Sequence, residues 1–217
     1  MLDINQIYKT FNAGTVNEKR ALNGLDLHLQ EGDFVTVIGG NGAGKSTMLN
    51  AIAGTWFVDE GSIVIDGVDV TRLSEHKRAK YLGRVFQDPM TGTAASMQIE
   101  ENLALAARRG KKRTLRIGIT AKEREEYKRQ LEILGLGLEN RLTASVGLLS
   151  GGQRQALTLL MATLQKPKLL LLDEHTAALD PKTAAKVLEV TDKIVNRDHL
   201  TTIMITHNMK DAIAHGN

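Results

Sequence analysis

Four short apolar runs, each ending in polar residues or glycines, constrain the fold of this chain more than any other feature. The runs are Phe34–Ile38, Leu82–Phe86, Leu169–Leu172 and Ile203–Ile205. Short unbroken runs of this kind are typical of the buried strands of a parallel sheet. Ligands of such sheets bind beyond the carboxyl ends of the strands. The pattern therefore predicts that the polar residues following all four runs converge on one site.

The remaining sequence predicts two further regions. Near the N-terminus, Leu2–Ile7 and Leu22–Leu29 are expected strands, and Ile63–Ile65 precedes Asp66-Gly67, a strong hairpin signal. From about residue 98 to residue 134 the chain is charged and helical without a strand pattern, which predicts an inserted helical sub-domain. The expected fold class is α/β, with a mostly parallel sheet and an N-terminal antiparallel β sub-domain.

The composition narrows the classes of partner. The net charge of +3 is too small to imply nucleic acid, and an aromatic content of 4% argues against base-stacking platforms. The absence of cysteine excludes disulfides and thiolate metal sites. The first residues have no basic segment followed by an apolar one, and the longest apolar runs are strand-sized. We expect a soluble protein of cytoplasmic type.

The segment after the first apolar run matches the phosphate-binding pattern G-x-x-x-x-G-K-[ST] in its proper context, after a strand and before a helix. The glycines let backbone N–H groups cradle phosphates, Lys45 reaches the β- and γ-phosphates, and the Ser46 hydroxyl ligates Mg²⁺. The predicted nucleotide-binding loop consists of Gly39, Gly40, Asn41, Gly42, Ala43, Gly44, Lys45, Ser46 and Thr47.

Polar residues at the other three strand ends are candidates for catalysis. Asp173 is suited to holding Mg²⁺, and Glu174 to orienting or deprotonating the attacking water, unless the pair only caps the strand end. His207 can hydrogen-bond the γ-phosphate, although a lone histidine is more often structural. Gln87 can contact Mg²⁺ or the water, or it is a solvated loop amide.

A second anion-binding helix start is expected at Leu149–Gln153. Ser150 as N-cap and Gln153 three residues later form a capping-box pattern. Gly151 and Gly152 leave the first turn bare, so that an anion can approach the helix end. The chain thus has two predicted phosphate sites, and the local sequence does not tell which phosphate the second one holds.

Together these motifs resemble those of the ATP-binding-cassette (ABC) ATPases, the nucleotide-binding subunits of ABC transporters. The resemblance covers nearly the whole chain and implies a P-loop NTPase fold with a RecA-like core, ATP and Mg²⁺ as ligands, and ATP hydrolysis. Its motifs are the Walker A loop Gly39–Thr47, the Q-loop Gln87, the signature Leu149–Gln153, the Walker B strand Leu169–Glu174, the D-loop Ala178–Asp180 and the switch His207. We expect a single domain over residues 1–217, with residues 1–87 and 167–217 as the core and about 88–166 as the helical sub-domain.

The resemblance also implies an assembly. Two such domains pack head to tail, and each signature helix binds the γ-phosphate held by the other subunit, with Asp180 reaching across the interface. Locally, Asp180 can equally cap a helix that begins with Pro181. Phe11 is placed to stack on adenine, or it is a core residue of the first sheet. Expected partners are a second, identical ATPase subunit, a permease contacted by residues 88–105 and a substrate-binding protein, but no nucleic acid.

The expected function is to power an importer of small solutes such as amino acids, from the cytoplasmic face of the cell membrane. Residues 173–181 and 102–119 look similar to bacterial ATPases of aromatic amino-acid (tryptophan or tyrosine) uptake, and His175 replaces the usual proline as a subgroup marker. The alternatives are a soluble ABC ATPase acting on ribosomes or DNA and a non-hydrolysing, nucleotide-gated module. Tandem cassettes and coiled-coil insertions, which favour the former, are absent.

Two features remain open at this level. A basic run is either a solvated loop or a contact for anionic headgroups or an acidic permease patch; it consists of Arg108, Arg109, Lys111, Lys112, Arg113 and Arg116. The sequence ends shortly after His207, where family members usually continue, so we expect either a missing C-terminal part or a short member.

Overall fold

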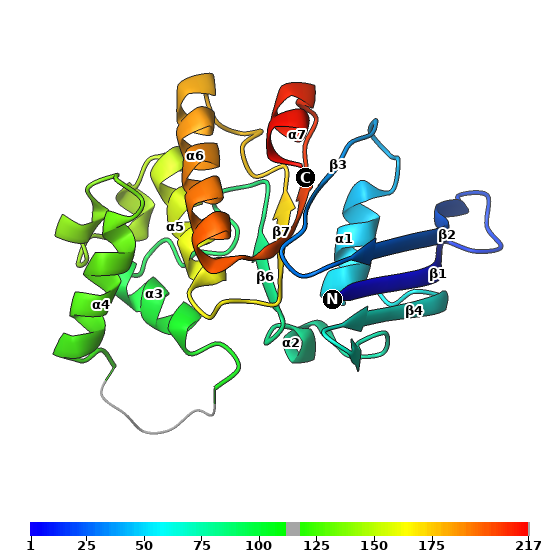
Figure 1. The fold of residues 1–217 in the computed structure, drawn as a ribbon, viewed down its shortest axis with the longest axis horizontal. Helices are drawn as coiled ribbons and strands as arrows, with labels where there is room; N and C mark the ends of the chain where they lie inside the picture. Colours follow the sequence, from blue (N-terminus) through cyan, green and yellow to red (C-terminus); the bar gives the residue numbers. More distant parts are fainter. Residues whose placement is uncertain (112–117, 217) are drawn as a thin grey trace. The chain divides into compact units, whose positions relative to one another are not determined.

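The computed structural model describes residues 1–111 and 118–216, which form two compact units (Figure 1). The sheet unit comprises Met1–Gly83, Lys168–Asp173 and His199–Asn217, and the helical unit comprises Arg84–Pro167 and Glu174–Asp198. The predicted division, with a helical sub-domain at about 88–166, differs from these units, because residues 174–198 pack with the helical unit. The predicted domain organisation therefore stays a prediction.

The N-terminal strands form an antiparallel sheet in the order β2-β1-β4-β5. The strands are β1 (Leu2–Phe11), β2 (Lys19–Leu29), β4 (Glu60–Ile65) and β5 (Val68–Asp69). The predicted hairpin is confirmed: β4 and β5 pair through a turn in which Asp66 and Gly67 have φ of 52° and 75°. Positive φ at both central residues is what a type I′ turn requires.

The apolar runs form the second sheet, in the order β3-β8-β7-β6. Its strands are β3 (Phe34–Val37), β6 (Leu82–Val85), β7 (Leu169–Asp173) and β8 (Thr201–Ile205). β8 pairs in parallel with β3 on one side and with β7 on the other. The first four residues of β7 and all of β8 are buried. The unbroken apolar pattern therefore reports burial on both faces, and the predicted α/β fold class is confirmed.

Helix α1 (Lys45–Ala53) fastens the phosphate loop to the core of the sheet unit. Its Leu49 and Ile52 are fully buried in one apolar cluster with residues of β1, β4, β7 and β8. At its C-terminus, the buried Arg78 of α2 (Glu75–Arg78) donates hydrogen bonds of 2.6 and 2.9 Å to the carbonyls of Ala51 and Ile52. Burial lowers the pKa of Arg78, and the carbonyl oxygens compensate its desolvated charge.

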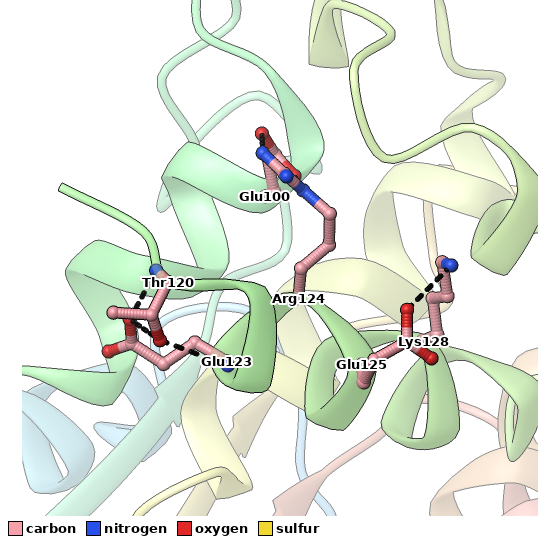
Figure 2. Close-up of polar contacts among 6 residues, drawn as sticks. All are labelled: Glu100, Thr120, Glu123, Arg124, Glu125 and Lys128. Carbon is pink, nitrogen blue, oxygen red and sulfur yellow. Dashed lines mark hydrogen bonds and ion pairs between the residues drawn. The ribbon is translucent and has the colours of Figure 1, made fainter.

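The helical unit contains α3 (Ile99–Ala107), α4 (Ala121–Glu132), α5 (Gly151–Thr163) and α6 (Pro181–Asp198), with short 3₁₀ turns at Leu138–Asn140 and Val146–Leu148. Figure 2 shows how α4 is held: Thr120 and Glu123 form its capping box, and Arg124 makes two bonds of 2.6 and 2.7 Å to Glu100 of α3. The Arg124 hydrogen bonds lower the pKa of Glu100. Helix α7 (Met209–His215) belongs to the sheet unit. Among the described residues, every helix is too short or too polar to span a bilayer.

Candidate functional site

Three strands of the parallel sheet end in one row. Val37 of β3 and Asp173 of β7 both pair in register with Ile205 of β8, the strand between them. The phosphate loop follows β3, and His207 follows β8 by two residues. Within the sheet unit, the carboxyl ends therefore place the loop, Asp173 and the segment of His207 at the same edge, as the sequence predicted. Gln87 is exposed just after β6, in the helical unit.

The phosphate loop leaves the start of α1 open. The N-cap residue Gly44 has φ of 89°, and no side chain caps the helix. A β-carbon at Gly44 would lie 2.4 Å from the carbonyl oxygen of Ala21 in β2, so only glycine fits there. Lys45 is 9% exposed, and its Nζ donates bonds of 2.7 and 3.0 Å to the carbonyls of Gly39 and Gly40. These bonds hold the ammonium group against the loop that is predicted to carry phosphates.

The residues available for a metal are oxygen donors, which suits Mg²⁺. Ser46 is exposed in the first turn of α1, and Asp173 is half-buried at the end of β7. No group of three acidic or histidine side chains among the described residues is placed to hold a metal ion. Mg²⁺ is usually bound through one or two protein ligands together with substrate phosphates, so such a cluster is not needed. The donor set thus fits a nucleotide-bound magnesium ion.

Glu174 has an unusual backbone conformation. Its φ of 46° lies in the left-handed region, and its carbonyl accepts a 2.9 Å bond from the backbone N–H of Ala177. Non-glycine residues in such conformations are concentrated at functional sites. The turn begins immediately after Asp173, so the direction of the chain changes at the acidic pair.

His175 is a residue whose contact the sequence did not reveal. It is only 2% exposed, and its Nε2 lies 3.2 Å from Oγ1 of Thr191 in α6. The Thr191 hydroxyl donates to the carbonyl of Val187 at 2.9 Å, so the imidazole N–H is the donor to the hydroxyl. This bond anchors the segment after Glu174 to α6, and no local pattern pairs residues 16 positions apart in this way.

The signature segment begins α5 as expected. Oγ of Ser150 accepts a 3.3 Å bond from the N–H of Gln153, and Oε1 of Gln153 accepts a 3.2 Å bond from the N–H of Ser150. The capping box is therefore confirmed. The glycines also have a packing role: a β-carbon at Gly152 would lie 2.0 Å from Cγ2 of Thr183 in α6, whereas one at Gly151 would lie 3.3 Å from the side chain of Leu179. Gly152 thus permits the close approach of α5 and α6.

A cavity of about 410 Å³ adjoins this helix start within the helical unit. Ser150, Gly152 and Gln153 line one part of it, and Lys182 and Lys186 of α6 line another. Lys186 is paired with Glu189 at 3.0 Å, so the positive charge at this cavity comes from Lys182 and from the N-terminal end of α5, which favour an anion.

The sequence leaves two interpretations open for Phe11 and two for Asp180. Phe11 is only partly buried, outside the apolar core, and its ring meets that of Trp56 edge-on with centroids 4.7 Å apart. Asp180 is exposed and accepts a 3.1 Å bond from the N–H of Thr183 through Oδ1. The bonds from Thr183 lower the pKa of Asp180. Capping of α6 by Asp180 is therefore confirmed, while its role at an interface stays a prediction.

The basic run is partly engaged within the chain. Arg108 pairs with Glu123 at 3.4 Å, and Arg109 donates a 3.0 Å bond to the carbonyl of Ala162. Burial lowers the pKa of Arg109. Lys111 is exposed. The other three members lie outside the described residues; they are Lys112, Arg113 and Arg116.

A glycine-rich loop between a parallel strand and a helix, with an aspartate at the end of another strand of the same sheet, defines the P-loop class of nucleotide-binding proteins. Residues 22–177 match the family model of ABC transporters, and the chain belongs to this family. It is therefore an ATP-binding protein of the ATPase family that ABC transporters use.

Individual relatives agree with this assignment. The tyrosine transport ATP-binding protein of Clostridioides difficile is 45% identical over 100% of this chain and 86% of its own length. The methionine import ATP-binding protein MetN of Escherichia coli K12 is 36% identical over 96% of this chain, which spans only 59% of that protein. A dimeric ATP-binding cassette, solved in a post-hydrolysis state with ADP and phosphate, superposes with a TM-score of 0.81 at 30% identity, covering 98% of this chain and 90% of the other.

Proposed function

We propose that this chain is the ATP-hydrolysing subunit of a membrane importer of small solutes, and that aromatic amino acids such as tyrosine are the imported class. The observation that carries the ATPase part is the row of strand ends, where Val37, Ile205 and Asp173 stand in register and the phosphate loop begins. The 45% identity to a tyrosine transport ATP-binding protein supports the class of imported solute.

In this proposal the phosphate loop binds the triphosphate. Backbone N–H groups of the loop and the ammonium group of Lys45 hold the β- and γ-phosphates. Ser46, Asp173 and Gln87 would hold Mg²⁺, which neutralises charge on the phosphates when bound. Phe11 stacks on adenine, and the edge-on contact with Trp56 fixes the orientation of its ring.

The hydrolytic step needs a base and a group on the γ-phosphate. Glu174 follows Asp173 in a left-handed turn and orients or deprotonates the attacking water. His207, exposed after the end of β8, donates a hydrogen bond to the γ-phosphate. His175 takes no part in this chemistry in our account; its bond to Thr191 holds the segment that carries Glu174.

The signature helix acts on a second copy. Ser150, Gly151, Gly152 and Gln153 of one chain bind the γ-phosphate held by the loop of another, and Asp180 lies at the interface between them. The similarity to a cassette solved as a dimer with ADP and phosphate supports this arrangement. ATP then favours the closed dimer, and hydrolysis releases it.

The dimer transmits this cycle to the membrane. A permease contacts residues 88–105, a substrate-binding protein delivers the solute, and the ATPase sits on the cytoplasmic face of the membrane. The chain spans only 59% of the length of the methionine import protein, so we do not propose that it has the whole activity of that protein.

Replacing Glu174 by glutamine tests the catalytic assignment. We expect the rate of phosphate release to fall by about 10²-fold or more, because the amide cannot accept the proton of the attacking water. ATP binding should persist, and an ATP-dependent dimer should be seen by light scattering after gel filtration. Hydrolysis by this variant at the parental rate would show that another group is the base.

A further inference from the structure

The start of β2 runs beside the phosphate loop. The carbonyl oxygen of Ala21 fills the place of a β-carbon at Gly44, and a β-carbon at Gly42 would lie 3.5 Å from Nζ of Lys19. Lys19 is the first residue of β2, and its side chain is exposed. Its ammonium group therefore lies next to Gly42 of the loop. Lys19 is not part of the phosphate-binding motif.

Within the described residues, the ammonium group of Lys19 has no charged or hydrogen-bonding partner, whereas Lys45 is bound to two loop carbonyls. The neighbouring acid, Glu18, accepts a 2.8 Å bond from the N–H of Gly14. An unpaired cation beside a loop in which Gly40 and Gly42 are exposed is available to an anionic ligand of that loop.

The register of the antiparallel sheet adds a second constraint. Lys19 of β2 pairs directly with Phe11 of β1. Side chains of directly opposed residues have their β-carbons about 5 Å apart. A nucleotide that stacks on Phe11 and places its phosphates in the loop must then pass close to the Lys19 ammonium.

We propose that Lys19 is a further nucleotide-binding residue, whose ammonium group adds a second positive side-chain charge to the phosphate loop and pairs with the phosphate chain of ATP. The proposal rests on the proposed function, in which the loop holds the triphosphate. Lys19 contributes to affinity and takes no part in the chemical step. Because its partner is the phosphate chain, its contribution grows with the negative charge of the nucleotide.

The test is the equilibrium affinity of the full chain for fluorescent mant-ATP and mant-ADP. We expect Lys19→Gln to raise the Kd for mant-ATP roughly three- to fivefold, the range of a solvent-exposed charge pair, and to raise that for mant-ADP less. Lys19→Arg should restore most of the affinity. The loss should shrink at about 1 M salt, where charges separated by more than a few ångström are screened.

Arg20→Gln is the matched control. Arg20 follows Lys19 in β2 and points to the opposite face of the strand, and its substitution also removes one positive charge. Its affinity should equal that of the parent. Equal affinity of Lys19→Gln and Arg20→Gln, with both variants melting at the parental temperature, would overturn the proposal. Lys45→Ala separates the two claims: if it binds mant-ATP as tightly as the parent, the proposed function itself fails.

Discussion

Two glycine-rich helix starts, that of α1 and that of α5, are assigned to phosphate here, yet they are built differently. The start of α1 has no side-chain cap, and Gly44 opens it in the left-handed conformation. The start of α5 is closed by its own capping box between Ser150 and Gln153. The first keeps its backbone N–H groups for a ligand of its own chain, whereas the second already satisfies one of them and presents the Ser150 hydroxyl from an ordered turn.

The glycines of the two starts also have different neighbours. Gly44 faces a backbone carbonyl, that of Ala21, while Gly152 faces a side chain, that of Thr183. A backbone atom of a paired strand cannot move aside, but a side chain can be shortened by mutation. Glycine is therefore required at both starts. A second mutation can relieve the clash of a larger residue at Gly152, but none can relieve it at Gly44.

Gly44→Ala should have the largest effect. A methyl group 2.4 Å from the Ala21 carbonyl, on a backbone with φ of 89°, combines a clash with left-handed strain. We expect a loss of about 2–4 kcal/mol in the free energy of unfolding, measured by urea denaturation. Gly40→Ala is the control in the same loop, since a β-carbon there meets nothing within 4 Å. Equal stability of the two variants would contradict this difference.

Gly152→Ala should lower the free energy of unfolding by less, and a second mutation should restore the lost stability. The added methyl group would lie 2.0 Å from Cγ2 of Thr183, and overpacking of this kind costs about 1–3 kcal/mol. Thr183→Ser removes that methyl while leaving the backbone N–H that Asp180 caps. Urea denaturation of the two single variants and the double variant gives the coupling free energy. If Thr183→Ser fails to recover stability, the crowding lies elsewhere.

Ser150→Ala tests the cap itself. Losing the bond from the N–H of Gln153 should lower the free energy of unfolding by about 1 kcal/mol, measured by thermal denaturation. Ser150→Asp keeps a good N-cap but places a negative charge where phosphate is proposed to bind. We therefore expect Ser150→Asp to be stable and to hydrolyse ATP poorly. An active aspartate variant would separate Ser150 from the phosphate.

The smallest effect concerns a third helix start, that of α6. The hydrogen bonds from Thr183 hold the pKa of Asp180 below its usual range. Because the folded pKa is below the unfolded one, the stabilisation is complete above the unfolded value and is lost as the pH falls through the folded value. Asp180→Asn keeps the cap without titrating. The stability difference between parent and variant should thus change only in acid, and a difference independent of pH would contradict it.

Local patterns in the sequence predicted much of this molecule, and nonlocal packing accounts for what they missed. Strand ends, the Asp66-Gly67 turn and the capping box of α5 depend on neighbouring residues, so they can be derived from spacing. The contact of His175 with Thr191 depends on how α6 packs. The place of Lys19 beside Gly42 likewise depends on how β2 passes the loop, and no motif contains both residues.

The central claim is that the two helix starts complete one site only when they come from different copies of the chain. Mixing a Ser150→Arg chain with a Lys45→Ala chain tests it most directly, by ATP hydrolysis. Each variant alone should be inactive, while a mixed dimer carries one pair of intact helix starts. We predict that hydrolysis reappears in the mixture. Its absence in mixed dimers that are shown to form would contradict the composite site.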